Sequence, residues 1–201
     1  MWIGGNKGCQ KHLCAHINVK WIGPQASFRA HGVDFSTNLD TMVTINYNKV
    51  LMSICHLFSQ WSKRNLTVLG RVTVVKSLIL SKLTFMILSL PDPPKSFVKD
   101  LDIMLYKFIW KGGDRVSRNQ MIQTYGQGGV KMIDLRSYIS ALKCTWIRRF
   151  LNTGNSGWAT LFSKITSIKN TLILEGGHSS IVQTLKAATH PNQFWIDVLT
   201  A

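Results

Sequence analysis

The sequence holds one close pair of carboxylates, Asp100 and Asp102. Two-metal phosphoryl chemistry uses paired carboxylates to hold two ions about 4 Å apart. These two residues stand two positions apart in a predicted helix, where their side chains do not face one another. We therefore favour a solvated helix face over a catalytic pair. No Tyr-x-Asp-Asp turn occurs anywhere in the sequence.

A second group of residues has the chemistry of zinc ligands: Cys9, His12, Cys14 and His16. Short zinc sites place two well-separated pairs of ligands, each pair straddling about two to four residues. The four residues here are too crowded for that arrangement, so coincidental composition is the favoured interpretation. We expect no metal site and no cofactor.

Nucleophilic and phosphate-loop chemistry have weaker support. Cys55 and His56 are adjacent in a predicted helix, where their side chains diverge by about 100°. Semi-buried packing is favoured for both. The segment Gly126-Gln127-Gly128-Gly129 lacks the Lys-Ser/Thr of a phosphate loop. It predicts instead a turn that lets the chain approach a neighbouring segment closely.

The strongest functional signal is basic charge, with 24 Lys and Arg against 9 Asp and Glu and a formal net charge of +15. Such a balance points to nucleic acid or to an anionic membrane surface. No acidic residue lies between Asp40 and Asp92. We predict that five residues of this interval contact phosphates without reading bases. They are Lys63, Arg64, Arg71, Lys76 and Lys82, and Lys143, Arg148 and Arg149 would extend the patch.

Nucleic acid is favoured over a membrane and over a solvated helix face with no partner. The most apolar run, Leu78 to Leu90, is about 13 residues long, short of the roughly 20 that span a bilayer. No secretory signal is evident at the N-terminus, and four cysteines do not form a disulfide scaffold. We expect an intracellular protein of the nucleus or cytoplasm without a membrane partner.

Periodicity predicts a mainly α fold after a short β-containing segment. Residues 1 to about 38 hold short apolar stretches between Gly and polar residues, typical of two or three strands. Asn65 or Thr67, Ser96 and Asp134 are candidate helix caps, and Pro91 and Gly112-Gly113 are candidate ends. Further helices are expected near 158–167 and 181–188, and an amphipathic turn over 194–199. Apolar residues at steps of three and four mark four helices, with the stripes Tyr47/Leu51/Ile54/Phe58/Trp61, Val72/Val75/Ile79/Leu83/Met86, Phe97/Leu101/Met104/Leu105/Phe108 and Leu135/Ile139/Leu142/Trp146/Phe150.

The order of several motifs resembles the post-palm region of LINE-type (non-LTR) retrotransposon reverse transcriptases. The run from Trp61 to Leu83 is similar to that family's W-x-x-R-x-L-T-x-x-G-R-x-x-x-x-K pattern. Phe108-Ile109-Trp110 is similar to its F-I-W, and the segments 128–135 and 194–195 to later motifs. Residues 28–36 resemble the primer-grip segment of the family. The primer-grip-like positions are Phe28, His31 and Gly32. The segment departs from the family pattern at Ala30 and His31, which stand where an aromatic residue and Leu are usual.

The resemblance implies a parent enzyme, an RNA-directed DNA polymerase that uses Mg²⁺. It also implies three parts of this chain: a palm remnant with a primer-grip-like segment over 1–38, a helical thumb-like domain over 39–152, and a partial linker over 153–201. The catalytic motifs would lie outside these parts. A fragment with residual, sequence-independent binding to RNA or an RNA–DNA hybrid, inactive on its own, is the expected function. The alternative is a domesticated, non-enzymatic module that binds nucleic acid or a protein.

Overall fold

The computed structural model describes residues 27–152, 156–166 and 193–201, together with single positions at 173, 177, 180, 181, 183 and 184. The described residues are mainly helical, with one small antiparallel sheet, which confirms the predicted fold class. The Cys9–His16 group and the predicted strands before residue 27 lie outside the described residues. The chain divides into two compact units, Met1–Asn46 and Tyr47–Ala201, and helix α1 (Leu39–Ser62) crosses the boundary.

The first unit contains a hairpin of β1 (Phe28–Ala30) and β2 (Val33–Phe35). Its two-residue turn has a positive φ at His31 and at Gly32, 49° and 82°. A primed turn requires such values, and they match the right-handed twist of the strands. The Phe28 and Phe35 rings stack across the strands at 5.2 Å. The buried Asn46 amide bonds both the main-chain N–H and C=O of Asp34, which fastens β2 to the first turns of α1.

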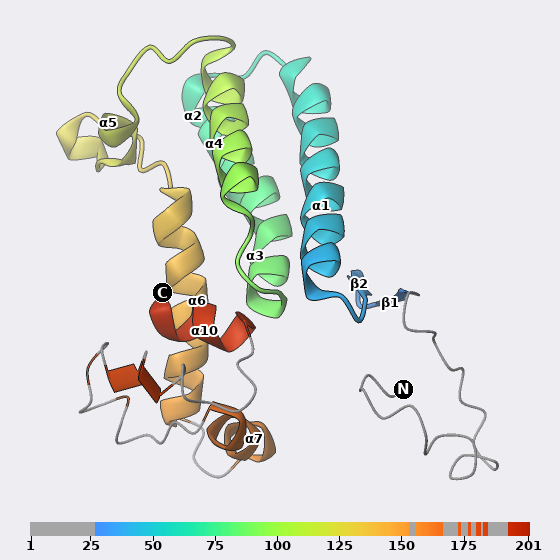
Figure 1. The fold of residues 1–201 in the computed structure, drawn as a ribbon. Coiled ribbons are helices and arrows are strands. Elements are labelled where there is room, and N and C mark those ends of the chain that lie inside the picture. The colour runs from blue at the N-terminus through green and yellow to red at the C-terminus, as the bar shows by residue number, and fades with distance from the viewer. Residues whose placement is uncertain are drawn as a thin grey trace. The chain divides into compact units, whose positions relative to one another are not determined.

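The second unit begins with the remainder of α1, which agrees with the predicted helix and its stripe. Tyr47 and Phe58 are buried. Their rings meet Phe97 and Phe108 of α4 (Lys95–Trp110) at 5.0 and 4.6 Å between centroids. These aromatic pairs pack α1 against α4 (Figure 1).

A continuous helix follows, formed by α2 (Val68–Val74), a π-helical segment η1 (Val75–Ile79) and α3 (Leu80–Ser89). Thr67 caps it by accepting a hydrogen bond from Gly70 N, and Pro91 follows its last turn, as predicted. The predicted stripe residues Val72, Val75, Ile79 and Leu83 are buried before, within and after the π turn. The stripe continues at Ile87, four residues after Leu83, and the predicted Met86 is half-buried.

This helix, Val68–Ser89, is the one helix among the described residues long and apolar enough to cross a membrane, judged by length and composition alone. The 13-residue run Leu78–Leu90 already includes Lys82, and the helix is longer because it begins at Val68 and continues through Lys76. Core helices of soluble proteins meet the same criterion, so this helix alone is weak evidence for a membrane.

Helix α4 begins one residue before the predicted cap. Pro94, not Ser96, occupies its N-cap position and makes no side-chain cap bond. The fixed φ of proline suits the start of a helix, and the Pro94 carbonyl accepts from Val98 N. The helix ends at Trp110, with Lys111 in the left-handed region at φ 57°.

A loop region with α5 (Arg118–Ile122) and a short 3-10 turn, η2 (Tyr125–Gln127), leads to α6 (Leu135–Asn152). The predicted close approach is confirmed at Gly129, where a Cβ would lie 2.1 Å from Gln123 O. Asp134 caps α6 by accepting from Ser137 N, also as predicted.

Helix α7 (Gly157–Thr166) occurs where a helix was predicted, and α10 (Gln193–Thr200) extends the predicted amphipathic turn over 194–199 into a helix. Most of the helix predicted at 181–188 lies outside the described residues. Together with the end of α6 they form a second apolar cluster, with Phe150, Phe162 and Leu199 buried in it. The described residues beyond 152 therefore share a core with α6.

Candidate nucleic-acid interface

Four of the five predicted phosphate-binding residues have solvent-accessible side chains. Lys63 and Arg64 are exposed directly after α1, and Lys82 is exposed on α3. Lys76 is half-buried in η1. None of the four forms a salt bridge with any carboxylate that the structure describes.

Arg71, the fifth, is buried, with 2% of its surface exposed. Its Nη1 donates to Phe108 O at 2.6 Å and its Nε to Leu66 O at 3.3 Å. The guanidinium carbon also lies 5.4 Å from the centre of the Phe108 ring. Arg71 thus joins α2 to the end of α4, which corrects the prediction of an exposed phosphate contact. It lies four residues before the buried Val75, and side chains at that spacing share one face of a helix.

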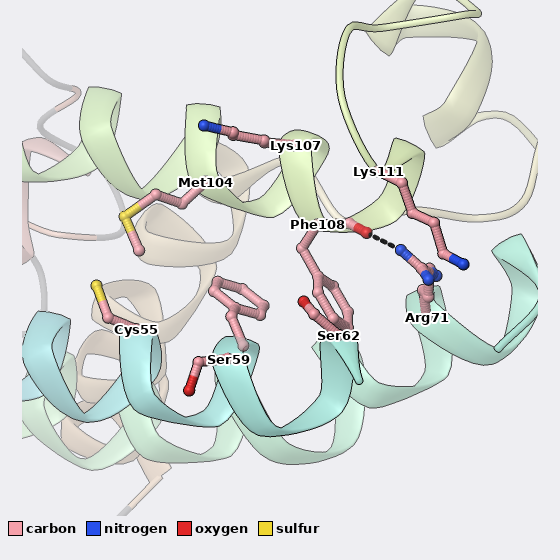
Figure 2. Close-up of a pocket in the computed structure, with 9 residues that line it drawn as sticks. Cys55, Ser59, Ser62, Arg71, Met104, Lys107, Phe108 and Lys111 are labelled. Carbon is pink, nitrogen blue, oxygen red and sulfur yellow. Dashed lines mark hydrogen bonds between the residues drawn. The ribbon is translucent and has the colours of Figure 1, made fainter. Parts of the chain in front are cut away.

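A pocket of about 400 Å³ lies against Arg71 in the second unit, where α1 ends, α2 begins and α4 ends (Figure 2). Its apolar wall includes Phe58, Met104 and Phe108, and its polar groups include Ser59 and Ser62. Three cationic residues also line it, Arg71, Lys107 and Lys111, and no carboxylate does.

The pocket gathers basic residues that are far apart in the sequence. Lys107 and Lys111 are exposed at the end of α4, and Lys63 and Arg64 follow the Ser62 that lines the pocket. We call Lys63, Arg64, Lys107 and Lys111 the basic end. The sequence interpretation missed Lys107 and Lys111, although their four-residue spacing on a predicted helix was a readable signal.

Three carboxylates of the second unit are engaged away from this pocket, whereas Asp100 is exposed on α4. Asp102 and Asp114 both pair with Arg118, and Asp134 caps α6. Burial raises the pKa of Asp102, and the Arg118 charge opposes that shift. Burial also raises the pKa of Tyr106 to about 12. Asp102 is therefore bound to Arg118 and does not fit a metal pair with Asp100, and no group of three or more potential metal ligands occurs among the described residues.

Lys143 does not extend the basic surface. Its side chain is fully buried, and Nζ donates to Leu90 O at 2.6 Å and lies 3.5 Å from Asp92 Oδ1. Burial lowers the pKa of Lys143, while the Asp92 and Asp197 carboxylates oppose the shift. The residue supports the turn between α3 and α4, which corrects the prediction of a surface contact. Arg148 and Arg149 are exposed on α6.

The primer-grip-like residues lie on the hairpin of the first unit. Phe28 stacks on Phe35, and His31 and Gly32 form the exposed turn. His31 therefore occupies a turn position and not the apolar position that the motif comparison gave it.

The Cys55 and His56 side chains on α1 have different neighbours. Cys55 is exposed and lines the pocket, while His56 hydrogen-bonds Gln60 at 2.9 Å. Both residues are exposed, so the predicted semi-buried packing is wrong.

No protein-family model matches the chain. The resemblance to retrotransposon reverse transcriptases therefore continues to depend on the sequence motifs alone.

Proposed function

We propose that the helical unit binds nucleic acid through its phosphate backbone, as the thumb-like part of a LINE-type reverse transcriptase. The observation that supports this most directly is the basic end. Its Lys107 and Lys111 line a pocket that has no carboxylate in its wall, and its Lys63 and Arg64 directly follow Ser62, which lines the same pocket. Lysine and arginine contacts to phosphates carry no base information. The partner is RNA or an RNA–DNA hybrid, bound without sequence preference.

The chain's charge distribution also supports backbone binding. Residues 41–91 contain no Asp or Glu, so nothing on this part of α1 or on α2–α3 offsets its cations. Lys76 and Lys82 stand six residues apart on one helix, about 9 Å along its axis. Both side chains are accessible to a partner that lies along this helix.

Catalysis is not part of the proposal. The parent enzyme would supply Mg²⁺ chemistry from carboxylates, and Asp100 and Asp102 do not form such a site. We expect the 201-residue chain to extend no primer on an RNA template, and magnesium-dependent extension would contradict this expectation.

Binding can be measured by fluorescence anisotropy with a labelled RNA–DNA hybrid over a series of salt concentrations. If about four phosphates are contacted, log affinity should fall with log salt at a slope of about −3 to −4. A fourfold Gln variant at the basic end (K63Q, R64Q, K107Q, K111Q) should lose most of that slope, about one unit for each residue.

The matched control removes the same charge at exposed positions elsewhere, in a K95Q, K99Q, R136Q, K164Q variant. It should keep most of the affinity of the unmodified chain. Equal losses in both variants would show that net charge alone drives binding, and a flat salt response would contradict backbone binding altogether.

A further inference from the structure

The pocket at the basic end contains an unsatisfied donor. Arg71 Nη2 is buried, and it is one of two buried side-chain nitrogens without a hydrogen-bond partner among the described residues. The other two guanidinium nitrogens already donate to main-chain carbonyls. A buried, charged donor without an acceptor is unfavourable, and an anion at this point would relieve it.

A second cationic residue lines the same pocket. Lys111 lies at the end of α4, and Figure 2 draws its side chain and that of Arg71 at the same end of the pocket. The carbonyl end of α4 favours a cation at Lys111, which accounts for that residue alone. It does not account for two cationic residues that line one pocket with no carboxylate in its wall. An oxyanion with several acceptor atoms would contact both.

The remainder of the pocket suits an apolar, flat group. Phe58 and Phe108 stack at 4.6 Å between centroids, and Met104 and Cys55 lie alongside in Figure 2. Ser59 and Ser62 supply hydroxyl groups near these rings. A volume of about 400 Å³ is within the usual range for small organic ligands and exceeds what a bare oxyanion needs.

We propose that this pocket binds a nucleotide unit, with its phosphate between Arg71 and Lys111 and its base against the Phe58–Phe108 side. The phosphate monoester could belong to a free nucleotide or to the phosphorylated end of a strand. The choice of a nucleotide over other phosphate esters rests on the proposed function. This pocket differs from the proposed backbone-binding surface, because it would bind a single nucleotide and not a row of backbone phosphates.

Isothermal titration of the 201-residue chain with adenosine 5′-monophosphate, adenosine and inorganic phosphate tests the two halves of the pocket. The nucleotide should bind at least about tenfold more tightly than either half, because each makes only part of the contacts. A 5′-phosphorylated oligonucleotide that outcompetes its 5′-hydroxyl form would identify a strand end as the source. Competition by the free nucleotide alone would identify a free ligand.

Two variants probe the site without touching the structural role of Arg71. Lys111→Gln should weaken nucleotide binding about tenfold, whereas Lys99→Gln, on the same helix outside the pocket, should not change it. Ser59→Trp should block the pocket and abolish nucleotide binding while leaving every charge of the basic end in place.

The outcomes separate this inference from the proposed function. Hybrid binding without nucleotide binding would overturn the pocket assignment and leave the proposed function standing. The pocket assignment would also be overturned if K111Q and S59W left nucleotide binding unchanged. The same holds if phosphatidic acid vesicles bound more tightly than the nucleotide and displaced it. Loss of hybrid and nucleotide binding together in the unmodified chain would contradict both.

Discussion

Replacing Lys143 by Met should destabilise the helical unit and leave its affinity for nucleic acid unchanged. The Lys143 side chain is fully buried and donates to Leu90 O, a main-chain atom of a residue that is itself fully buried. Methionine is of similar length and apolar, so it fills the space without leaving a cavity. The change therefore isolates the polar contact.

The expected loss follows from the atoms left behind. A hydrogen bond from a charged donor to a buried acceptor contributes about 1.5–3 kcal/mol, and Leu90 O would lose it. The Asp92 carboxylate is 46% exposed, so water replaces much of its interaction with Lys143 and that part adds little. Removal of a buried charge offsets some of the loss. We expect the free energy of unfolding to fall by about 2 kcal/mol.

Urea denaturation followed by circular dichroism measures this change, with Lys95→Met as the control at an exposed position. The control should stay within about 0.5 kcal/mol of the unmodified chain. A loss below that limit for K143M, or a loss of hybrid affinity with intact stability, would refute the buried role and restore the predicted surface contact.

The difference in unfolding free energy between the unmodified chain and K143M should depend on pH. Burial lowers the pKa of Lys143 from its ordinary value of 10.5, so the unfolded chain binds more protons than the folded one between the two values. The contribution of Lys143 to stability therefore increases as pH rises through that window. The stability difference between the unmodified chain and K143M should widen on approach to pH 10.5.

Three further changes test other contacts. Tyr47→Phe removes a buried hydroxyl that donates to a main-chain carbonyl at 2.9 Å, and urea denaturation should show a loss of about 1 kcal/mol. Gly129→Ala places a Cβ 2.1 Å from Gln123 O, so it should expose the loop before α6 to limited proteolysis, whereas Gly126→Ala meets nothing within 4 Å and should not. Burial raises the pKa of Tyr106 to about 12, so the unfolding free energy should fall as pH rises from 10 toward 12. Tyr106→Phe should reduce that fall. An unchanged pH profile of the unfolding free energy in this variant would contradict the raised pKa.

The sequence was informative wherever a local rule governs the backbone. Apolar spacing located α1, the α2–α3 helix, α4 and α6, because a helix must turn one face to the core. The sequence also predicted the N-caps at Thr67 and Asp134 and the helix end at Pro91, because each of these effects acts within a few residues. Apolar spacing did not predict the π turn over Val75–Ile79, and it predicted Met86 where the buried residue is Ile87.

The role of each cation was decided by tertiary structure. Lys63, Arg71 and Lys143 belong to the same class of residue, yet the first is exposed and the other two are buried. Arg71 finds its acceptor 37 residues away at Phe108 O, and Lys143 finds its own 53 residues away at Leu90 O. Burial of a charge requires an acceptor supplied by another segment, and sequence spacing carries no information about that segment.

The sequence by itself determined the helices, the fold class and a large excess of positive charge. Tertiary structure alone determined which of those charges meet. Lys107 and Lys111 line one pocket with Arg71, and Ser62, which Lys63 and Arg64 follow, lines it too, because α1 and α4 end there and α2 begins there. Helix formation depends on neighbours three and four residues apart, whereas a charged pocket depends on helix ends that packing brings together from distant parts of the chain.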